Sequence, residues 1–388
     1  MQYFCGTGVA HFEGFNLYAK FDKNGKVTMA GNHRMLRNGN AGKYTEATSL
    51  YSLLLEDGPV LAFNTWNDVL TPFVDPVNPW AAPNTLVKDG EGMEGDHNFV
   101  IQSYNDGEVI LRGERHGAEV RLTACPVTWA EYIAATDKTK NYITNTSIAS
   151  YYVTTDTDTL YFTGLRNGRF LYSENLTNPV KLDSLSCVFT PTGFRTEKVD
   201  SIGTHKFQEF ILAQDSTCLV SNDQSIKVTA TWDNYIVGHS ALWKFDTSLF
   251  NAELQDIYSK IASELLAINK NYVLESISWG KSSGGGAVNG IVLRFYTNSR
   301  KSSTNTAGLT ITVRKTSFGK LKFISSENDK MDNNLTALCK KSSELSNLMY
   351  QFASKIQGTY EITPNNYFLP TGATFSPVEG GVEFKLKL

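Results

Sequence analysis

The chain has 388 residues and a mass of 43.0 kDa, which is more than one hydrophobic core usually serves, so two domains are expected. Hydrophobic residues make up 41% of the sequence and charged residues 19%, which is typical of an ordered, β-rich globular protein and excludes a disordered one. The net charge is −3 and no dense stripe of lysine and arginine is present, so no nucleic-acid partner is expected.

The N-terminal sequence contains no recognisable secretory signal. Met1 is followed at once by the strand-like QYFCG, without the charged region and long apolar region that a signal needs. Because a folded domain rarely begins inside a strand, we expect the sequence to be a shortened form of a longer protein. No apolar run of about 18 residues occurs anywhere, so no membrane-spanning helix is expected.

Short strand patterns dominate the first part of the chain. Residues 15–29 alternate around Asp22-Lys23-Asn24-Gly25, in which Asn-Gly predicts a hairpin turn, and the Gly- and Asn-rich loop 31–42 with its RNGN run is expected to supply flexibility and no chemistry. Residues 49–55 and 60–63 predict a buried hairpin. A short helix is expected after it, since Trp66, Val69, Leu70 and Phe73 have helical spacing.

Further short strands follow a proline-rich connection at residues 77–95. Three runs, 98–103, 108–112 and 118–123, predict a meander, and a short helix is expected at 126–137. Strand patterns then recur every eight to twelve residues. The sequence therefore predicts an antiparallel β-rich domain over residues 1–225, either a sandwich or a closed barrel, with a lipocalin-like barrel among the alternatives.

The remaining residues, 226–388, predict an α+β domain with two long helices on an antiparallel sheet. The first helix is expected to start at an N-cap within residues 246–248. Each predicted helix has an apolar stripe, formed by Leu249, Phe250, Leu254, Ile257, Ile261, Leu265 and Ile268 in the first and by Leu335, Leu338, Leu345, Leu348, Phe352 and Ile356 in the second.

No motif in the sequence carries catalytic or cofactor chemistry. The six histidines form neither HxH nor HExxH, and the glycines at 284–290 lie between predicted strands, where no helix N-terminus could hold a phosphate. We therefore name no catalytic residue, metal ligand or cofactor, and a non-enzymatic protein is favoured over an enzyme. The five cysteines, which are far apart, are interpreted as isolated buried thiols, with one long-range disulfide or a reactive cysteine as alternatives.

Aromatic and amide side chains near the predicted hairpin are the candidate ligand-binding residues. They are Trp66 and Trp80, with Asn64, Asn67 and Asn78 beside them. A flat apolar ring next to amides is suited to stack on a sugar or to line a peptide groove. The alternative interpretation is that these rings anchor the core or the loops, since tryptophan is highly buried on average.

The first 125 residues resemble a Bacteroidetes lipoprotein family called domain of unknown function 4302. The resemblance rests on FNLYAKFDKNGKVTM, TSLYSLLLEDGPVLAFNTWNDVLTPFVDP and GDHNFVIQSYNDGEVILRGERHGAEVRLT, with weaker support from VFTPTGFRTEKV and NLMYQFASKIQGTYEI. It implies an exported protein with a signal peptide and a lipid-attachment cysteine, encoded near nutrient-uptake systems of the outer membrane. Cys5 lies inside the matched strand and is not that cysteine. The family supplies no catalytic residues that could be transferred.

Together these observations predict a non-enzymatic lipoprotein that faces the cell surface or the periplasm. It is expected to bind an extracellular glycan or peptide for an outer-membrane uptake system, and to touch the membrane only through a lipid anchor that this sequence lacks. The first alternative is a hydrolase that acts on glycans or peptides. The second is a structural partner of an outer-membrane complex, which a broad exposed apolar patch would favour.

Overall fold

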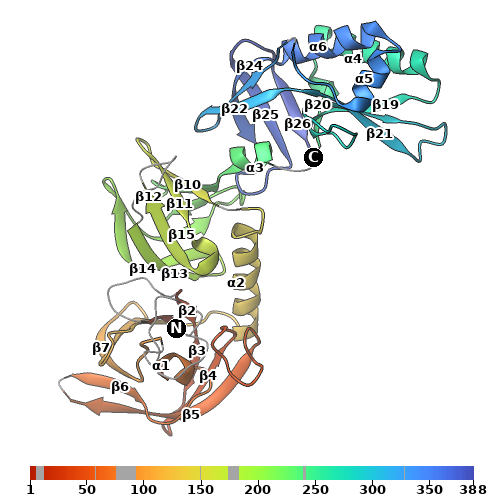
Figure 1. Ribbon diagram of the computed structural model, residues 1–388. Helices are drawn as coiled ribbons and strands as arrows, with labels where there is room; N and C mark the ends of the chain where they lie inside the picture. The colour runs from red at the N-terminus through yellow and green to blue at the C-terminus, as the bar shows by residue number, and fades with distance from the viewer. Residues whose placement is uncertain are drawn as a thin grey trace. The chain divides into compact units, whose positions relative to one another are not determined.

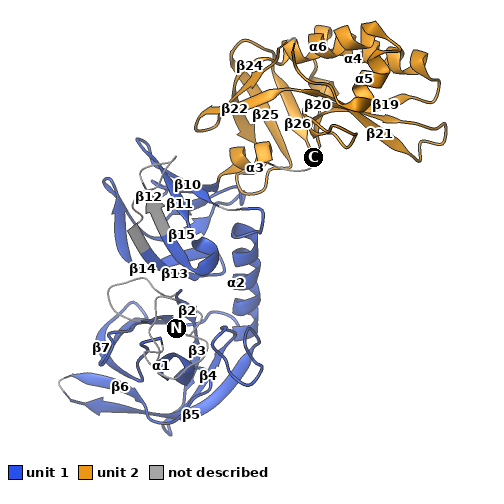
Figure 2. Cartoon of the chain, in the orientation of Figure 1, with its two compact units in different colours: residues 1–230 blue, residues 231–388 orange. Residues whose placement is uncertain are grey.

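The computed structural model of the chain describes residues 1–5, 13–56, 58–75, 93–148, 150–173, 183–238, 242–326 and 328–388. The chain divides into two compact units, Met1–Ala230 and Thr231–Leu388 (Figures 1 and 2). The first contains a nine-stranded sheet and a closed barrel, and the second contains another nine-stranded sheet. All strand pairings described are antiparallel, so the predicted β-rich, antiparallel character is confirmed.

The first sheet has the strand order β2-β1-β9-β8-β7-β6-β5-β4-β3. Its strands are β1 (Gln2–Phe4), β2 (Phe15–Asn16), β3 (Tyr18–Phe21), β4 (Lys26–Gly31), β5 (Thr45–Leu55), β6 (Pro59–Phe63), β7 (Asn98–Asn105), β8 (Glu108–Gly113) and β9 (Glu119–Thr123), with the short helix α1 (Thr71–Val74) after β6. Alternate side chains such as Tyr3, Met29 and Phe99 point into one core, which follows from the two-residue period of a strand. The predicted meander is formed by β7, β8 and β9.

The barrel consists of eight strands in chain order, and β17 closes it by pairing with β10. The strands are β10 (Tyr151–Thr154), β11 (Thr159–Thr163), β12 (Arg169–Ser173), β13 (Asp183–Phe189), β14 (Gly193–Ile202), β15 (His205–Leu212), β16 (Leu219–Ser221) and β17 (Lys227–Ala230), with a 3-10 turn, η1 (Leu165–Asn167), before β12. Phe162, Phe170, Phe194 and Phe210 are fully buried. The Phe162 and Phe170 ring centroids lie 4.2 Å apart, and those of Phe194 and Phe210 lie 5.0 Å apart. The expected single barrel or sandwich is thus divided between an open sheet and a barrel.

A 15-residue helix, α2 (Trp129–Ile143), joins the sheet to the barrel. Thr128 and Glu131 form a capping box at its start. Farther along, the Thr139 hydroxyl donates to the Pro191 carbonyl oxygen at 2.6 Å, which fixes the helix to the barrel. The prediction that the long helices lie only after residue 225 is therefore wrong. The pattern underestimated α2 because its buried side chains are mainly threonines and do not form an apolar stripe.

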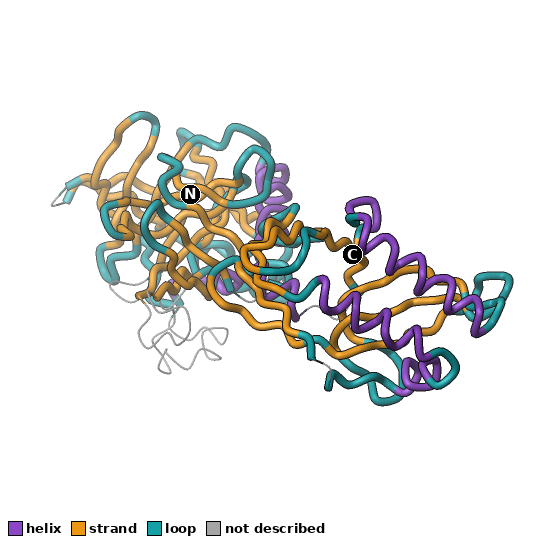
Figure 3. Tube along the Cα trace, turned by 90° about the horizontal axis from the view of Figure 1, so that it is seen from above, coloured by secondary structure: helices purple, strands orange, loops and turns teal. Residues whose placement is uncertain are grey.

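The sheet of the second unit has the strand order β21-β20-β19-β18-β26-β25-β24-β23-β22. Its strands are β18 (Trp243–Phe245), β19 (Val273–Lys281), β20 (Asn289–Tyr296), β21 (Thr304–Thr310), β22 (Thr312–Ser317), β23 (Lys320–Ile324), β24 (Gly358–Pro364), β25 (Gly372–Glu379) and β26 (Phe384–Lys387). Helices α3 (Trp232–Gly238), α4 (Ala252–Ile268), α5 (Asn333–Cys339) and α6 (Ser343–Lys355) and the 3-10 turn η2 (Thr247–Leu249) complete the unit. Figure 3 shows the long helices lying across the strands.

Two helix boundaries differ from the prediction because polar caps determine them. Helix α4 begins after Asn251, whose side-chain oxygen accepts from the Leu254 amide at 2.9 Å, and not within residues 246–248. The predicted second helix is two helices, since the Ser342 hydroxyl accepts from the Leu345 amide and starts α6 anew after α5. An apolar stripe can continue across such a break and therefore does not reveal it.

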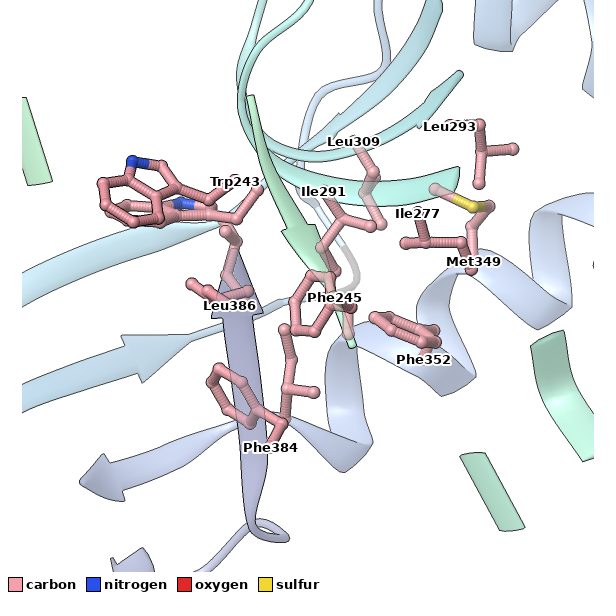
Figure 4. Packing of buried hydrophobic residues seen from close by; sticks show 14 of the residues in the cluster. Trp243, Phe245, Ile277, Ile291, Leu293, Leu309, Met349, Phe352, Phe384 and Leu386 are labelled. Carbon is pink, nitrogen blue, oxygen red and sulfur yellow. The ribbon is translucent and has the colours of Figure 1, made fainter. Parts of the chain in front are cut away.

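The core of the second unit lies between the sheet and the helices. Figure 4 shows Phe352 of α6 facing Phe245 of β18, with Phe384 of β26 nearby. The Phe245 ring centroid is 5.2 Å from that of Phe352 and 5.2 Å from that of Phe384. The Phe245–Phe352 pair is edge-to-face, and the Phe245–Phe384 pair is tilted. An edge-to-face contact adds about 0.5–1.5 kcal/mol to the effect of burial. Among the described residues, no helix is long and apolar enough to cross a membrane.

Candidate functional site

The β5–β6 hairpin carries the candidate site at its exit. It pairs Tyr51 with Phe63 near its base and Leu55 with Pro59 at its tip. Phe63 is buried, but Leu53 is 67% exposed and Leu55 is 87% exposed. The expectation of a buried hairpin is therefore wrong for the tip, which extends past the core. Residue type alone could not show this, because an apolar run has the same sequence pattern whether neighbouring segments cover it or leave it exposed.

Asn67 holds the exit of the hairpin in place. It is 1% exposed, and its side-chain nitrogen donates to the Ser49 hydroxyl at 2.9 Å. Its side-chain oxygen accepts from the backbone amides of Val69 at 3.0 Å and of Leu70 at 3.4 Å. Both ends of the amide are used inside the protein, so Asn67 supports the site and is not placed to contact a ligand. The helix expected from Trp66 onward is therefore shorter and begins only at Thr71, as α1, because the turn that Asn67 stabilises occupies the preceding residues.

Trp66 is held at the surface immediately beside this anchor. It is 53% exposed, and its indole Nε1 donates to the Asp68 carboxylate at 2.6 Å. The guanidinium carbon of Arg37 lies 5.4 Å from the centroid of the Trp66 ring. A cation over one face and a carboxylate at the N–H edge fix the orientation of the indole. A ligand would stack on the remaining face.

Arg37 belongs to the RNGN run, for which the sequence indicated flexibility and no chemistry. The structure corrects that interpretation, because Arg37 forms an ion pair with Asp75, which follows α1, while it covers Trp66. Arg37 Nε is buried and has no hydrogen-bond partner among the described residues. Arg37, Asp68 and Asp75 were missed by the sequence reasoning. Only the spacing of Trp66 and Asp68, two residues apart, could have suggested one of them.

The other candidate residues are placed unequally. Asn64 is exposed and exchanges hydrogen bonds with Ser52 on the neighbouring strand, its nitrogen donating to the hydroxyl at 3.0 Å. Trp80 and Asn78 lie outside the described residues. The structure therefore brings Trp66 and Asn64 to one exposed hairpin exit, above the buried Asn67. Charged donors and acceptors surround the ring, an arrangement that suits a ligand with both a flat apolar face and hydroxyl or amide groups.

Two further sequence features, the Asp22 turn and the cysteines, can be compared with the structure. The Asp22 carboxylate accepts from the backbone amides of Asn24 and Lys26, at 2.7 and 2.9 Å, so the Asp-Lys-Asn-Gly stretch is a turn. The five cysteines are free thiols, and Cys5, Cys187 and Cys218 are buried as expected. The expectation of buried thiols is wrong for Cys125, which is exposed, and for Cys339, which is half-buried. In the described part of the chain, no group of three or more His, Cys, Asp or Glu side chains is arranged to hold a metal ion.

Comparisons with known proteins support the sequence resemblance. The model of the family described as "Domain of unknown function (DUF4302)" matches residues 1–214, which is more than half of the chain and ends after β15. No curated protein matches. One similar solved structure is a C. crescentus beta sliding clamp, with 11% identity over 96% of this chain and 89% of that chain. Its TM-score of 0.14 is too low to support any argument about fold or function.

Proposed function

Because the chain belongs to the family called domain of unknown function 4302, we propose that it serves as a non-enzymatic binding protein for an extracellular glycan or peptide. The observation that carries this proposal is the exposed Trp66 ring, fixed by Arg37 and Asp68 on a rigid hairpin exit. An exposed ring leaves apolar surface in contact with water, which is unfavourable. Rings that a rigid scaffold holds in this way commonly stack on ligands. Asn64 is exposed, and its amide keeps a second N–H and a second oxygen lone pair for a ligand beyond the hydrogen bonds that it exchanges with Ser52.

The remaining parts of the proposed function rest on the family resemblance. We propose that the native protein is exported, anchored by lipid in the outer membrane, and delivers its ligand to an uptake system there. Labelling of the native protein with a radioactive fatty acid, followed by membrane fractionation, tests the anchor. An unlabelled protein in the cytoplasmic fraction would contradict it. We propose that the barrel resembles a lipocalin only in its strand order. Phenylalanine rings fill its interior, where a lipocalin barrel holds a ligand.

Replacement of Trp66 tests the binding site. In W66A, we expect the free energy of unfolding to fall by less than about 1 kcal/mol, because the ring is half exposed and a surface cation–π contact contributes about that much. Ligand binding should weaken by about 1–3 kcal/mol, the contribution of aromatic stacking on other planar ligands. Glycan and peptide arrays identify the ligand, and thermal melts run in parallel measure folding.

Tyr104 provides a matched control, because it is an aromatic residue of the same sheet that is 71% exposed. Y104A should retain both stability and binding. Selective loss of binding in W66A, with Y104A unchanged, supports the site. Equal binding by W66A and the wild type would remove Trp66 from the proposal, and an absence of binding to every glycan and peptide on the arrays would refute the function itself.

A further inference from the structure

The tip of the β5–β6 hairpin has a free sheet edge. Strand β4 pairs with β5 only from Thr45 to Leu50, and the Tyr51 amide then donates to the Gly25 carbonyl oxygen at 2.8 Å. Strand β5 continues to Leu55, paired with β6 on its other side (Figure 1). In the described part of the chain, residues 52–55 therefore have no strand beside them on the β4 side.

The hydrogen bonds of the hairpin show which backbone groups face this edge. The Asn64 amide donates to the Leu50 carbonyl oxygen at 3.0 Å, so the backbone groups of Leu50 face β6. The Tyr51 amide faces the opposite way, toward β4. Because N–H and C=O groups of successive strand residues alternate between the two sides, Leu53 and Leu55 also direct theirs to the free edge. No strand among the described residues pairs with these groups.

The side chains at this edge are apolar and exposed. Leu53 is 67% exposed, Leu54 is 39% exposed and Leu55 is 87% exposed. Leu53 and Leu55 lie on one face of the strand and Leu54 on the other. Native sheet edges usually carry charged side chains or proline, which prevent pairing with another chain, and residues 52–55 contain neither. Exposed apolar side chains and unpaired backbone groups together can accept a further strand.

A second copy of the same strand fits this edge. Gly25 occupies the position beside Tyr51, so a strand added at the edge ends opposite Leu53. The longest antiparallel self-pairing within this limit places Leu53 opposite Leu55 of the second copy, and Leu54 opposite Leu54. The Leu53–Leu55 positions are then hydrogen-bonded pairs, because their N–H and C=O groups face one another. The two Leu54 side chains meet at the two-fold axis.

Charge complementarity also favours a second copy as the occupant. In this register, the exposed Glu56 of one copy approaches the β3–β4 turn of the other, because Gly25 of that turn limits the pairing. The turn region carries Lys23 and Lys26, which are exposed and form no ion pair with the described residues. The Asp22 carboxylate of the turn already accepts from two backbone amides. The free charges that meet are therefore of opposite sign.

We propose that two copies of this chain associate through the tips of their β5–β6 hairpins, by antiparallel pairing of residues 53–55 across a two-fold axis. The pairing joins the two hairpins into one continuous sheet and covers the exposed leucines of both copies. The contact is smaller than the roughly 1,200–2,000 Å² of stable interfaces, so the dimer is weak and reversible. It does not involve Trp66 and does not depend on the function proposed there. A strand from another protein is the competing occupant.

Sedimentation equilibrium of the full chain tests this proposal, at concentrations from about 1 μM to about 1 mM, where small interfaces associate. We expect a reversible equilibrium between monomer and dimer. L53K places a charge at the paired edge and should weaken the dimer at least about tenfold. E56K should weaken it as well, since it repels Lys23 and Lys26. V199K is the matched control, because Val199 is an apolar residue that is 57% exposed on β14, and it should dimerise as the wild type does.

The L53P variant tests the role of the backbone. Proline removes the N–H of residue 53, which faces the free edge, and leaves the hydrogen bonds between β5 and β6 in place. L53P should therefore lose the dimer while its melting temperature falls little. L54P removes an N–H that faces β6 and should melt much lower. An association that needed only apolar side chains would tolerate L53P, because proline is apolar.

Cysteine cross-linking tests the register. The Cα atoms of a non-hydrogen-bonded antiparallel pair lie about 4.5 Å apart, which is within the range of a disulfide. L54C should therefore form a covalent dimer on mild oxidation with copper phenanthroline, in a C125S background that removes the exposed native thiol. L53C is the matched control. Its two copies are displaced along the strands, so it should cross-link slowly.

Several outcomes would overturn the proposal. They are a monomer at every concentration, which would leave the edge to a strand from another protein, equal dimerisation of the wild type and either L53K or L53P, and cross-linking of L53C as fast as that of L54C. W66A should leave dimerisation unchanged, so failure here and failure at the Trp66 surface are distinguishable.

Discussion

His33 is expected to make the first unit sensitive to acid. Its folded-state pKa is about 4, lowered mainly by burial and further by the nearby Arg34 charge, against an ordinary value of 6.5. Between these two values the unfolded chain binds a proton that the folded chain does not, so the free energy of unfolding falls as the pH falls. At about 1.4 kcal/mol for each tenfold change in proton affinity, this histidine removes about 2.5 kcal/mol between pH 7.5 and pH 4.5.

The H33Q variant isolates this effect. Glutamine can place a side-chain N–H where His33 Nε2 donates to the Val69 carbonyl oxygen, and it does not titrate. We expect the stability advantage of the wild type over H33Q to shrink by about 2.5 kcal/mol between pH 7.5 and pH 4.5. Urea unfolding at four pH values, followed by tryptophan fluorescence and circular dichroism, measures the difference.

The H33N variant is the comparison for the hydrogen bond. Asparagine is too short to reach the Val69 carbonyl oxygen, so H33N should lose about 1 kcal/mol at pH 7.5 as well as the pH dependence. If the pH profiles of the wild type and H33Q run parallel to within about 0.5 kcal/mol, as for a histidine with an ordinary pKa, the reasoning from burial is refuted.

Two further predictions concern buried carboxylates in the second unit. Lys315 Nζ lies 2.8 Å from the carboxylate of the fully buried Asp233. We expect K315M to lower the free energy of unfolding by about 2 kcal/mol, which is below the roughly 3–5 kcal/mol of fully buried pairs because the Lys315 side chain is 37% exposed. Urea unfolding measures this loss, and K315R should recover most of it. The Asp332 carboxylate accepts from the backbone amides of Leu335 at 2.8 Å and Gly308 at 2.9 Å. We expect D332A to lower the free energy of unfolding by about 2–4 kcal/mol, and D332N to lower it by less. A loss under about 1 kcal/mol in D332A would show that these hydrogen bonds do not stabilise the fold.

The sequence by itself determined the local elements. Two-residue alternation predicted the first hairpin, because side-chain direction along a strand depends only on the backbone. Short runs bounded by turn residues predicted the second hairpin and the meander. The Asn-Gly turn and the apolar stripe of α4 were predicted for the same reason, since each is encoded within a few neighbouring residues. Helix α2 was underestimated because threonines, and not large apolar side chains, form its buried face.

Only the tertiary structure decided which residues from distant segments meet. Arg37 contacts Trp66 across 29 positions, and Gly25 bonds to Tyr51 across 26 positions. No local pattern encodes such contacts, because they arise where segments that are distant in the sequence pack together. Burial was also undetermined by residue type, as the buried Asn67 and the exposed Leu55 show. The candidate sites therefore depend on how the elements pack against one another. A strand or helix pattern describes one element at a time and does not specify that packing.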